Sequence, residues 1–168
     1  VILSMGTASA AEPRARDLGI PFPGTPGPLN AITDVAGVEV GYTTLIAGDG
    51  KLVVGKGPVR TGVTAVLPRG RKDLSGVFGG YAVGNGNGEM TGTHWVGDAG
   101  YFLGPILITN THGIGACHHG ATEWMIRHYD THFREEHAWA MPIVAETYDG
   151  TLNDINALHV RPEHAVAA

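Results

Sequence analysis

The chain has 168 residues, of which 43 % are hydrophobic and 16 % are charged, and its formal net charge is −5. This length suits one domain with a sizeable buried core. The longest basic cluster is "RGRK" at residues 69–72, so the sequence lacks the basic patch of a nucleic-acid-binding protein. It also lacks the ~18 to 20 consecutive apolar residues of a membrane span. We therefore expect neither nucleic acid nor a membrane among its partners.

Glycine is the outlier in the composition. The chain has 26 glycines, about twice the usual share, and they do not follow the Gly-X-Y period of collagen. Many tight turns and close backbone approaches between short strands are the expected result. The single cysteine, Cys117, excludes a disulfide within the chain and leaves the redox compartment open.

Residues 1–13, "VILSMGTASAAEP", resemble the second half of a secretory signal peptide. An apolar stretch is followed by small residues, and Ala8-Ser9-Ala10 forms an A-x-A cleavage site. The alternative is a flexible tail of small residues. We expect a periplasmic or secreted protein, with the cytoplasm as the alternative location.

Four of the ten prolines lie in residues 14–34. Prolines at this density prevent a regular helix or a central strand, so the segment is predicted to be an extended arm that wraps a core. Alternating and β-branched patterns then predict a series of strands. These strands are expected at residues 38–46, 61–68, 75–83 and 105–111, and an apolar run predicts one more at residues 141–145.

Helical patterns are fewer. They predict a short helix at residues 91–103, a stronger one at residues 121–133 with Thr122 as its N-cap, and a last one at residues 161–168 that opens with Pro162. Strands come first, helices follow, and one strand comes after them, which favours layered α+β packing over alternating βαβ units. Because the last helix has barely two turns when the sequence stops, we expect the chain to be part of a longer protein.

Six of the nine histidines lie between His112 and His137. His128 and His132 are four residues apart on a predicted helix, so both side chains can reach one metal ion. The segment has no HExxH order and no CxxC partner, and Glu135-Glu136-His137 adds only loose ligand candidates. A polar helix face rich in histidine explains the cluster more simply, and we assign no metal and no cofactor.

Two other stretches carry weaker signals. Cys117 is followed by His118 and His119 and would have a lowered pKa at a helix N-terminus, although a lone buried cysteine is the commoner case. The stretch "GNGNGEMTG" at residues 84–92 matches neither the GxxxxGK[ST] phosphate loop nor a GxGxxG placed between a strand and a helix. A flexible turn whose glycines permit positive φ is the preferred interpretation.

The stretch "IVAETYDGTLND" at residues 143–154 places an acid, Glu146, and a phenol, Tyr148, where a buried strand ends at an Asp-Gly turn. Side chains there are held by the sheet and still face solvent, which suits a binding site. A carboxylate in that place can hold a substrate ammonium, and a tyrosine can donate a hydrogen bond or line a pocket. The alternative is an edge acid paired with an arginine and a packed tyrosine, and the residues alone do not decide between them.

Several long stretches together resemble one family from Arg14 onward. They are "RARDLGIPFPGTPGPLNAITDVAGVEVGYTTLI", "GKGPVRTGVTAVLP", "GNGNGEMTG", "FLGPILITNT" and "PIVAETYDGTLND". They are similar to the start of the α-subunit in the β-peptidyl aminopeptidase / L-aminopeptidase–D-amidase/esterase family. The resemblance implies that residues 14–168 are the N-terminal part of the α-subunit of a single hydrolase domain, with an α+β fold of four layers, an αββα sandwich like that of N-terminal-nucleophile hydrolases.

The resemblance also implies a mechanism. Family members cleave themselves once, and the new N-terminal serine of the β-subunit is the nucleophile that releases an N-terminal amino acid from a peptide, amide or ester. That serine and the asparagine of the oxyanion hole are expected downstream of this chain, so no catalytic residue is assigned here, and Ser4, Ser9 and Ser75 are not substitutes. The implied partners are the β-subunit from the same precursor, a substrate with a free amino terminus, and further αβ pairs in a homo-oligomer.

Carried over by position, Glu146 matches the family acid that binds the substrate's amino group, and Tyr148 matches a position that lines the same pocket. Two other functions remain open at this point. One is a relative of the same fold that hydrolyses ω-amino-acid oligomers or transfers acyl groups. The other is a non-catalytic, His-rich metal-binding scaffold.

Overall fold

A computed structural model describes residues 13–168 of the chain. The predicted signal-peptide remnant therefore lies almost wholly outside the described residues, as do Ser4 and Ser9. Contacts divide the chain into two compact units, Val1–Ala31 and Ile32–Ala168. Within the described part, no helix is long and apolar enough to cross a membrane.

Two arginines organise the described part of the first unit. The guanidinium of Arg14 donates to the carbonyl oxygens of Leu29, at 2.6 Å, and of Asn30. That of Arg16 donates to the Phe22 carbonyl at 3.2 Å and lies 5.6 Å from the centre of the Phe22 ring. The unit contains turns and bends but neither helix nor strand in its described residues, as the density of prolines predicted. That the segment wraps a core stays a prediction.

The second unit is built on a four-stranded sheet with the order β1-β2-β5-β6. Antiparallel pairing joins β1 (Glu39–Ala47) to β2 (Val59–Leu67), and β2 to β5 (Ile106–Asn110). In contrast, β5 and β6 (Ile143–Thr147) run parallel. A parallel pair needs a crossover connection, which here consists of two helices.

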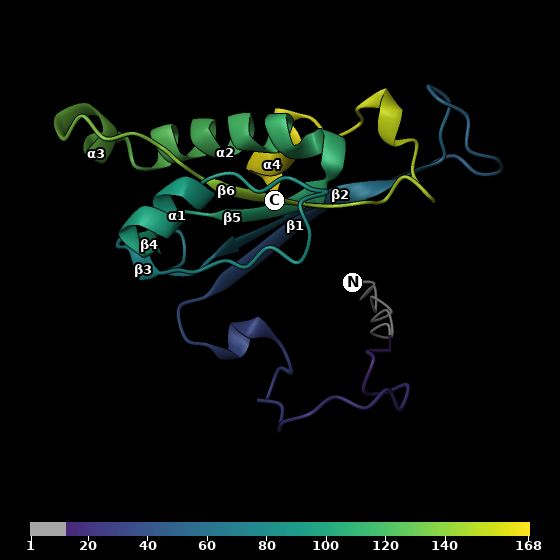
Figure 1. Ribbon diagram of the computed structural model, residues 1–168, viewed down its shortest axis with the longest axis horizontal. Coiled ribbons are helices and arrows are strands. Elements are labelled where there is room, and N and C mark those ends of the chain that lie inside the picture. Colours follow the sequence, from purple (N-terminus) through teal and green to yellow (C-terminus); the bar gives the residue numbers. More distant parts are fainter. Residues whose placement is uncertain (1–12) are drawn as a thin grey trace, which may run out of the picture. The chain divides into compact units, whose positions relative to one another are not determined.

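The remaining elements are short. They are the helices α1 (Thr93–Ala99), α2 (Ile114–His128), α3 (Asp130–Glu135) and α4 (Pro162–Ala167), the two-residue strands β3 (Val77–Phe78) and β4 (Tyr101–Phe102), and the 3-10 turns η1 (Ile32–Asp34), η2 (Thr111–Gly113) and η3 (Ile155–Ala157). Helices α2 and α4 lie over one face of the sheet (Figure 1). This arrangement confirms the predicted α+β class. It contains one helical layer and one sheet layer of the four layers expected for an αββα sandwich.

The main core lies between the sheet and these two helices. Leu107 and Val144 project from neighbouring strands and are 1 % and 0 % exposed. They pack with Cys117 and Ala121 of α2 and with Ala165 of α4. Burial of such apolar side chains stabilises the packing of helix on sheet at about 25 cal/mol per Å².

The opposite face of the sheet is covered at the start of β5 and β6, where Val96 of α1 and Phe102 of β4 pack with Ile143, and it is open along β1. On β1, the side chains that alternate with the core-facing ones are exposed, among them Tyr42 at 72 % and Ile46 at 70 %. Ile108 of β5, two strands away, is 41 % exposed. The sheet therefore presents a second, largely apolar surface on the side away from α2 and α4.

Most of the predicted strands and the last helix are confirmed, and three predictions are wrong in part. The strand expected at residues 75–83 is only the two residues of β3, and the helix expected at residues 91–103 ends at Ala99, where Gly100 takes a left-handed φ of 73°. The helix expected at residues 121–133 begins at Ile114 instead, so Thr122 is not its N-cap.

The early start of α2 has a physical reason. The Asn110 side chain accepts a hydrogen bond from the Gly113 N–H at 2.8 Å and so caps the turn that leads into the helix. The glycines that suggested a loop are helical, and a Cβ at Gly120 would lie 2.3 Å from the carbonyl oxygen of Pro162. Gly120 is thus the point where α4 approaches α2 closely.

Candidate functional site

The carboxyl ends of β5 and β6 meet at one edge of the sheet, because the two strands are parallel and in register. Thr109 is paired with Glu146, and Asn110 with Thr147. The residue after β5 is Thr111, the first of η2. The pairing therefore places a hydroxyl and a carboxylate from distant parts of the chain next to each other.

The Glu146 side chain is half-buried, and its carboxylate is held in place. Thr111 Oγ1 donates a hydrogen bond to Glu146 Oε2, and the Glu146 backbone N–H donates to the carbonyl oxygen of Glu89 at 3.2 Å. Within the described part of the chain no cation pairs with Glu146, so the edge salt bridge with an arginine is not found. An ionised carboxylate accepts several hydrogen bonds, and the single hydroxyl leaves acceptor capacity for an ammonium group.

The stretch "GNGNGEMTG" has a structural role that the sequence did not predict. Its second half runs along the outer edge of β6, where Met90 bridges Ala145 and the Thr91 N–H donates to the Val144 carbonyl at 3.0 Å. Among its glycines, only Gly92 has a positive φ, of 75°. The preferred interpretation as a flexible turn is therefore wrong for this half, since it serves as an edge partner for the strand that carries Glu146.

Tyr148 lies just beyond the end of β6 and is 68 % exposed. It is therefore not packed in the core, and its ring lies against Gly150, where a Cβ would be 2.6 Å from the phenol oxygen. The structure brings both predicted binding residues to the same end of the same strand. The Asp149-Gly150 turn that follows redirects the chain back toward the core.

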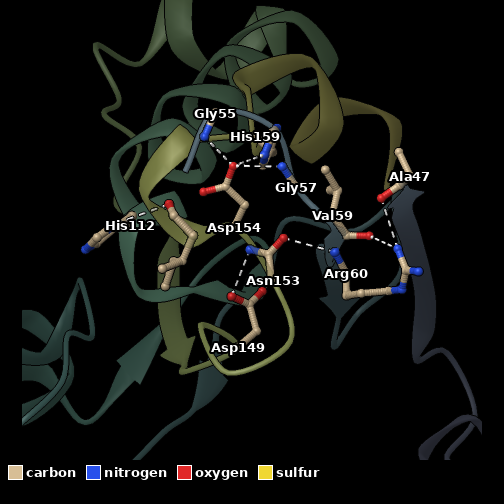
Figure 2. Close-up of polar contacts among 11 residues, drawn as sticks. Ala47, Gly55, Gly57, Val59, Arg60, His112, Asp149, Asn153, Asp154 and His159 are labelled. Carbon is tan, nitrogen blue, oxygen red and sulfur yellow. Dashed lines mark hydrogen bonds and ion pairs between the residues drawn. The ribbon is translucent and has the colours of Figure 1, made fainter. Parts of the chain in front are cut away.

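Two buried polar side chains, Asn153 and Asp154, fix the other end of this turn (Figure 2). Both are 0 % exposed. Asp154 Oδ2 accepts hydrogen bonds from the N–H groups of Gly55, at 2.7 Å, and Gly57, at 3.3 Å. His159 Nε2 lies 3.5 Å from the same oxygen. Burial of a carboxylate is costly unless it is hydrogen-bonded. The amides from the loop between β1 and β2 supply bonds to Oδ2, whereas no group in residues 13–168 bonds Oδ1.

Asn153 connects the turn to the start of β2. Its Oδ1 accepts from the Arg60 N–H at 3.0 Å, and its Nδ2 donates to Asp149 Oδ1 at 3.0 Å (Figure 2). Arg60 in turn donates to the Ala47 carbonyl at 3.0 Å. The loop that carries Tyr148 is therefore anchored at both ends, by β6 on one side and by the buried side chains of Asn153 and Asp154 on the other.

Sequence reasoning missed Thr111, Asn153 and Asp154. The last two stand in the quoted stretch "TLND", and the preference of Asn and Asp side chains for backbone N–H groups near turns was a usable signal. Thr111 gave no such signal, because its contact with Glu146 depends on which strands become neighbours.

The predicted histidine pair is separated. Tyr129, with a non-helical φ of −111°, divides α2 from α3, so His128 and His132 lie on different helices. His128 Nε2 contacts the Arg71 carbonyl, and His132 Nδ1 lies 2.8 Å from Glu136 Oε2. In residues 13–168 no group of three or more His, Cys, Asp or Glu is arranged to hold a metal ion.

Cys117 is a core residue and not an activated thiol. It is the fourth residue of α2 and is 0 % exposed. Burial raises the pKa of its thiol to about 11, and a hydrogen bond with Thr109 opposes this only in part. The commoner interpretation, a lone buried cysteine, is confirmed.

Comparison with known proteins gives the family. The sequence profile of Peptidase family S58 matches residues 30–168. The chain belongs to this family. It is 58 % identical over 167 residues to the beta-peptidyl aminopeptidase BapA of Sphingosinicella microcystinivorans, covering 99 % of this chain and 41 % of the relative. It is 51 % identical to BapA of Sphingosinicella xenopeptidilytica, with 100 % and 41 % covered.

A solved structure of the L-aminopeptidase D-Ala-esterase/amidase from Ochrobactrum anthropi matches with a TM-score of 0.84 and 52 % identity, over 94 % of this chain and 44 % of that one. That structure is described as a variant of the Ntn hydrolase fold, which agrees with the resemblance seen in the sequence. The chain spans about two fifths of the length of its S58 relatives.

Burial makes a prediction for Cys117. The thiol should resist iodoacetamide at pH 8 in the folded protein and react in denaturant, as measured by peptide mass spectrometry. Since the folded pKa lies above the unfolded value, the stabilisation from the neutral thiol is complete below pH 9 and is lost as pH rises through about 11. In Cys117→Ala, the free energy of unfolding should depend less steeply on pH in that range. Labelling of the native thiol at pH 8 would contradict this account.

The Asp154 contacts predict a loss of stability. Asp154→Ala leaves the Gly55 amide without its acceptor, whereas the Gly57 amide keeps the Val53 carbonyl at 3.1 Å. An unsatisfied group costs about 1 to 3 kcal/mol, and we expect the free energy of unfolding in urea to fall by that amount. As a control, Asp98→Ala removes an exposed carboxylate on α1 and should cost less than half as much. Equal losses for the two variants would contradict the role of Asp154.

Proposed function

We propose that the protein to which this chain belongs is a self-processing serine aminopeptidase/amidase. It releases N-terminal amino acids, of the α-, D- or β- type, from peptides, amides or esters. Membership of family S58 and the names of the relatives support this activity. The observation that carries it is the half-buried Glu146 carboxylate, which is held at the end of β6 with acceptor capacity left unused.

In this proposal Glu146 anchors the free ammonium of the substrate. An aminopeptidase must select the first residue of a chain, and a fixed carboxylate does so because only the terminal residue carries an ammonium. A charge-assisted hydrogen bond in a site from which water is excluded is strong and directional. Tyr148, exposed at the same strand end, forms a wall of the pocket that receives the first side chain.

The nucleophile lies on another part of the protein. Self-cleavage of the precursor exposes an N-terminal serine on a β-subunit, and an asparagine outside this chain completes the oxyanion hole. Ser75 does not substitute for that serine. Its nitrogen belongs to a peptide bond and donates to Asp73 Oδ1 at 2.8 Å in an exposed turn, so it is not a free amino terminus. The signal-like residues 1–13 support a periplasmic location for the assembly.

The β-subunit is the proposed partner for the open face of the sheet. Tyr42 and Ile46 project from this face on β1, with Ile108 from β5, two strands away. Exposed apolar surface of this kind is characteristic of an interaction site. A second sheet packed there completes the four layers of the αββα sandwich, and several αβ pairs assemble into a homo-oligomer.

The anchoring role of Glu146 predicts the outcome of Glu146→Gln in the full-length protein. Loss of one partner of a desolvated charge pair costs about 3 to 5 kcal/mol, so kcat/KM for aminoacyl p-nitroanilides should fall about 100-fold or more. Self-cleavage, followed by intact-mass analysis, should remain normal. Unchanged kcat/KM in a normally processed variant would remove the anchoring role.

The proposed partner surface predicts that lysine substitutions at Ile46 and Ile126 have different effects on assembly. Ile46→Lys places a charge on the open sheet face and should prevent co-purification of the β-subunit and abolish activity, because a buried unpaired charge is costly. Ile126→Lys, on the outer side of α2 where the isoleucine is 47 % exposed, should have little effect. Native mass spectrometry measures the assembly, and an intact αβ assembly in Ile46→Lys would contradict the proposed packing.

A further inference from the structure

The two oxygens of the Glu146 carboxylate have different surroundings. Oε2 accepts the hydrogen bond from the Thr111 hydroxyl. Oε1 lies over Gly88, so close that a Cβ on this glycine would be 2.4 Å from it. Both neighbours come from outside β6, one from the turn after β5 and one from the segment on the outer edge of β6.

Thr111 is itself held firmly. It follows Asn110, which is 4 % exposed and whose Nδ2 donates to Thr61 Oγ1 at 2.8 Å. Asn110 Oδ1 also caps the turn that Thr111 begins, through the Gly113 N–H. The hydroxyl that meets Glu146 therefore projects from a backbone fixed by buried hydrogen bonds on β2 and at the start of α2.

Gly88 is required for space and not for its backbone conformation. Its φ lies outside the left-handed region, so alanine fits the backbone there. The three nearest atoms to a Cβ at this position all belong to the Glu146 side chain. Because that side chain is flexible, Gly88→Ala would displace the carboxylate and leave the rest of the fold in place.

We propose that Thr111 and Gly88 are positioning residues that together fix the Glu146 carboxylate for the substrate's ammonium. This inference rests on the proposed function of Glu146. The Thr111 hydroxyl holds one oxygen, and the bare backbone of Gly88 leaves room for the other. Ordering the carboxylate before substrate arrives removes a rotamer cost from binding and sets its direction.

The test uses the full-length protein and aminoacyl p-nitroanilides. Thr111→Val removes the hydroxyl at nearly constant volume, Thr111→Ser restores it, and Gly88→Ala adds one methyl group beside Oε1. Loss of a hydrogen bond to a charged group corresponds to roughly 10- to 100-fold. We therefore expect kcat/KM to fall at least tenfold in Thr111→Val and Gly88→Ala and to recover within threefold in Thr111→Ser.

Matched controls separate positioning from damage to the fold. Thr131→Val changes an exposed threonine on α3, and Gly86→Ala adds a methyl group where nothing lies within 4 Å. Both should keep kcat/KM within twofold of the unmodified protein. Melting temperatures of all variants should agree within about 3 °C.

A second background decides whether the residues act through Glu146. In Glu146→Ala, which has no carboxylate to position, adding Thr111→Val or Gly88→Ala should lower kcat/KM by less than twofold, since coupled residues are non-additive. Losses of equal size in both backgrounds, or no loss beyond that of the controls, would overturn the positioning role. If Glu146→Ala alone left kcat/KM unchanged, the anchoring function itself would fail.

Discussion

The parallel pairing of β5 with β6 is the constraint on which the rest of the structure depends. Parallel strands cannot be joined by a hairpin, so the chain between them must cross the sheet, and it does so through α2 and α3. This crossover places α2 over the sheet and creates the core around Leu107 and Val144. It also makes both strands end at the same edge, where Thr111 and Glu146 meet.

Hydrogen bonds hold the chain in place on three sides of that edge. The segment at residues 88–91 bonds along the outer side of β6, the capped turn after β5 supports Thr111, and the buried pair Asn153 and Asp154 fixes the loop beyond Tyr148. Each support uses backbone groups that would otherwise be unsatisfied. The same hydrogen bonds therefore stabilise the fold and hold the two candidate binding residues in place.

In the proposed function, this chain supplies the residues that select a substrate, and the bond-breaking serine belongs to another part of the protein. This division suits a reaction in which recognition of an ammonium and attack on a carbonyl are separate tasks. In the proposed function, specificity depends on the direction of the Glu146 carboxylate and on the side chain of Tyr148. The subunit proposed to pack on the open sheet face carries the nucleophile.

The sequence by itself determined the strands at β1, β2, β5 and β6, the proline-rich first unit, the family and the two binding candidates, because these depend on local patterns and long motifs. It did not determine that α2 begins at Ile114, since the glycines that follow the capping residue Asn110 suggested a loop. Only the tertiary structure brought Thr111 and Gly88 to Glu146 and placed Asp154 under the loop between β1 and β2. Those contacts join residues 35 to 99 positions apart. Strand pairing brings such residues together, and no local sequence pattern indicates which strands will pair.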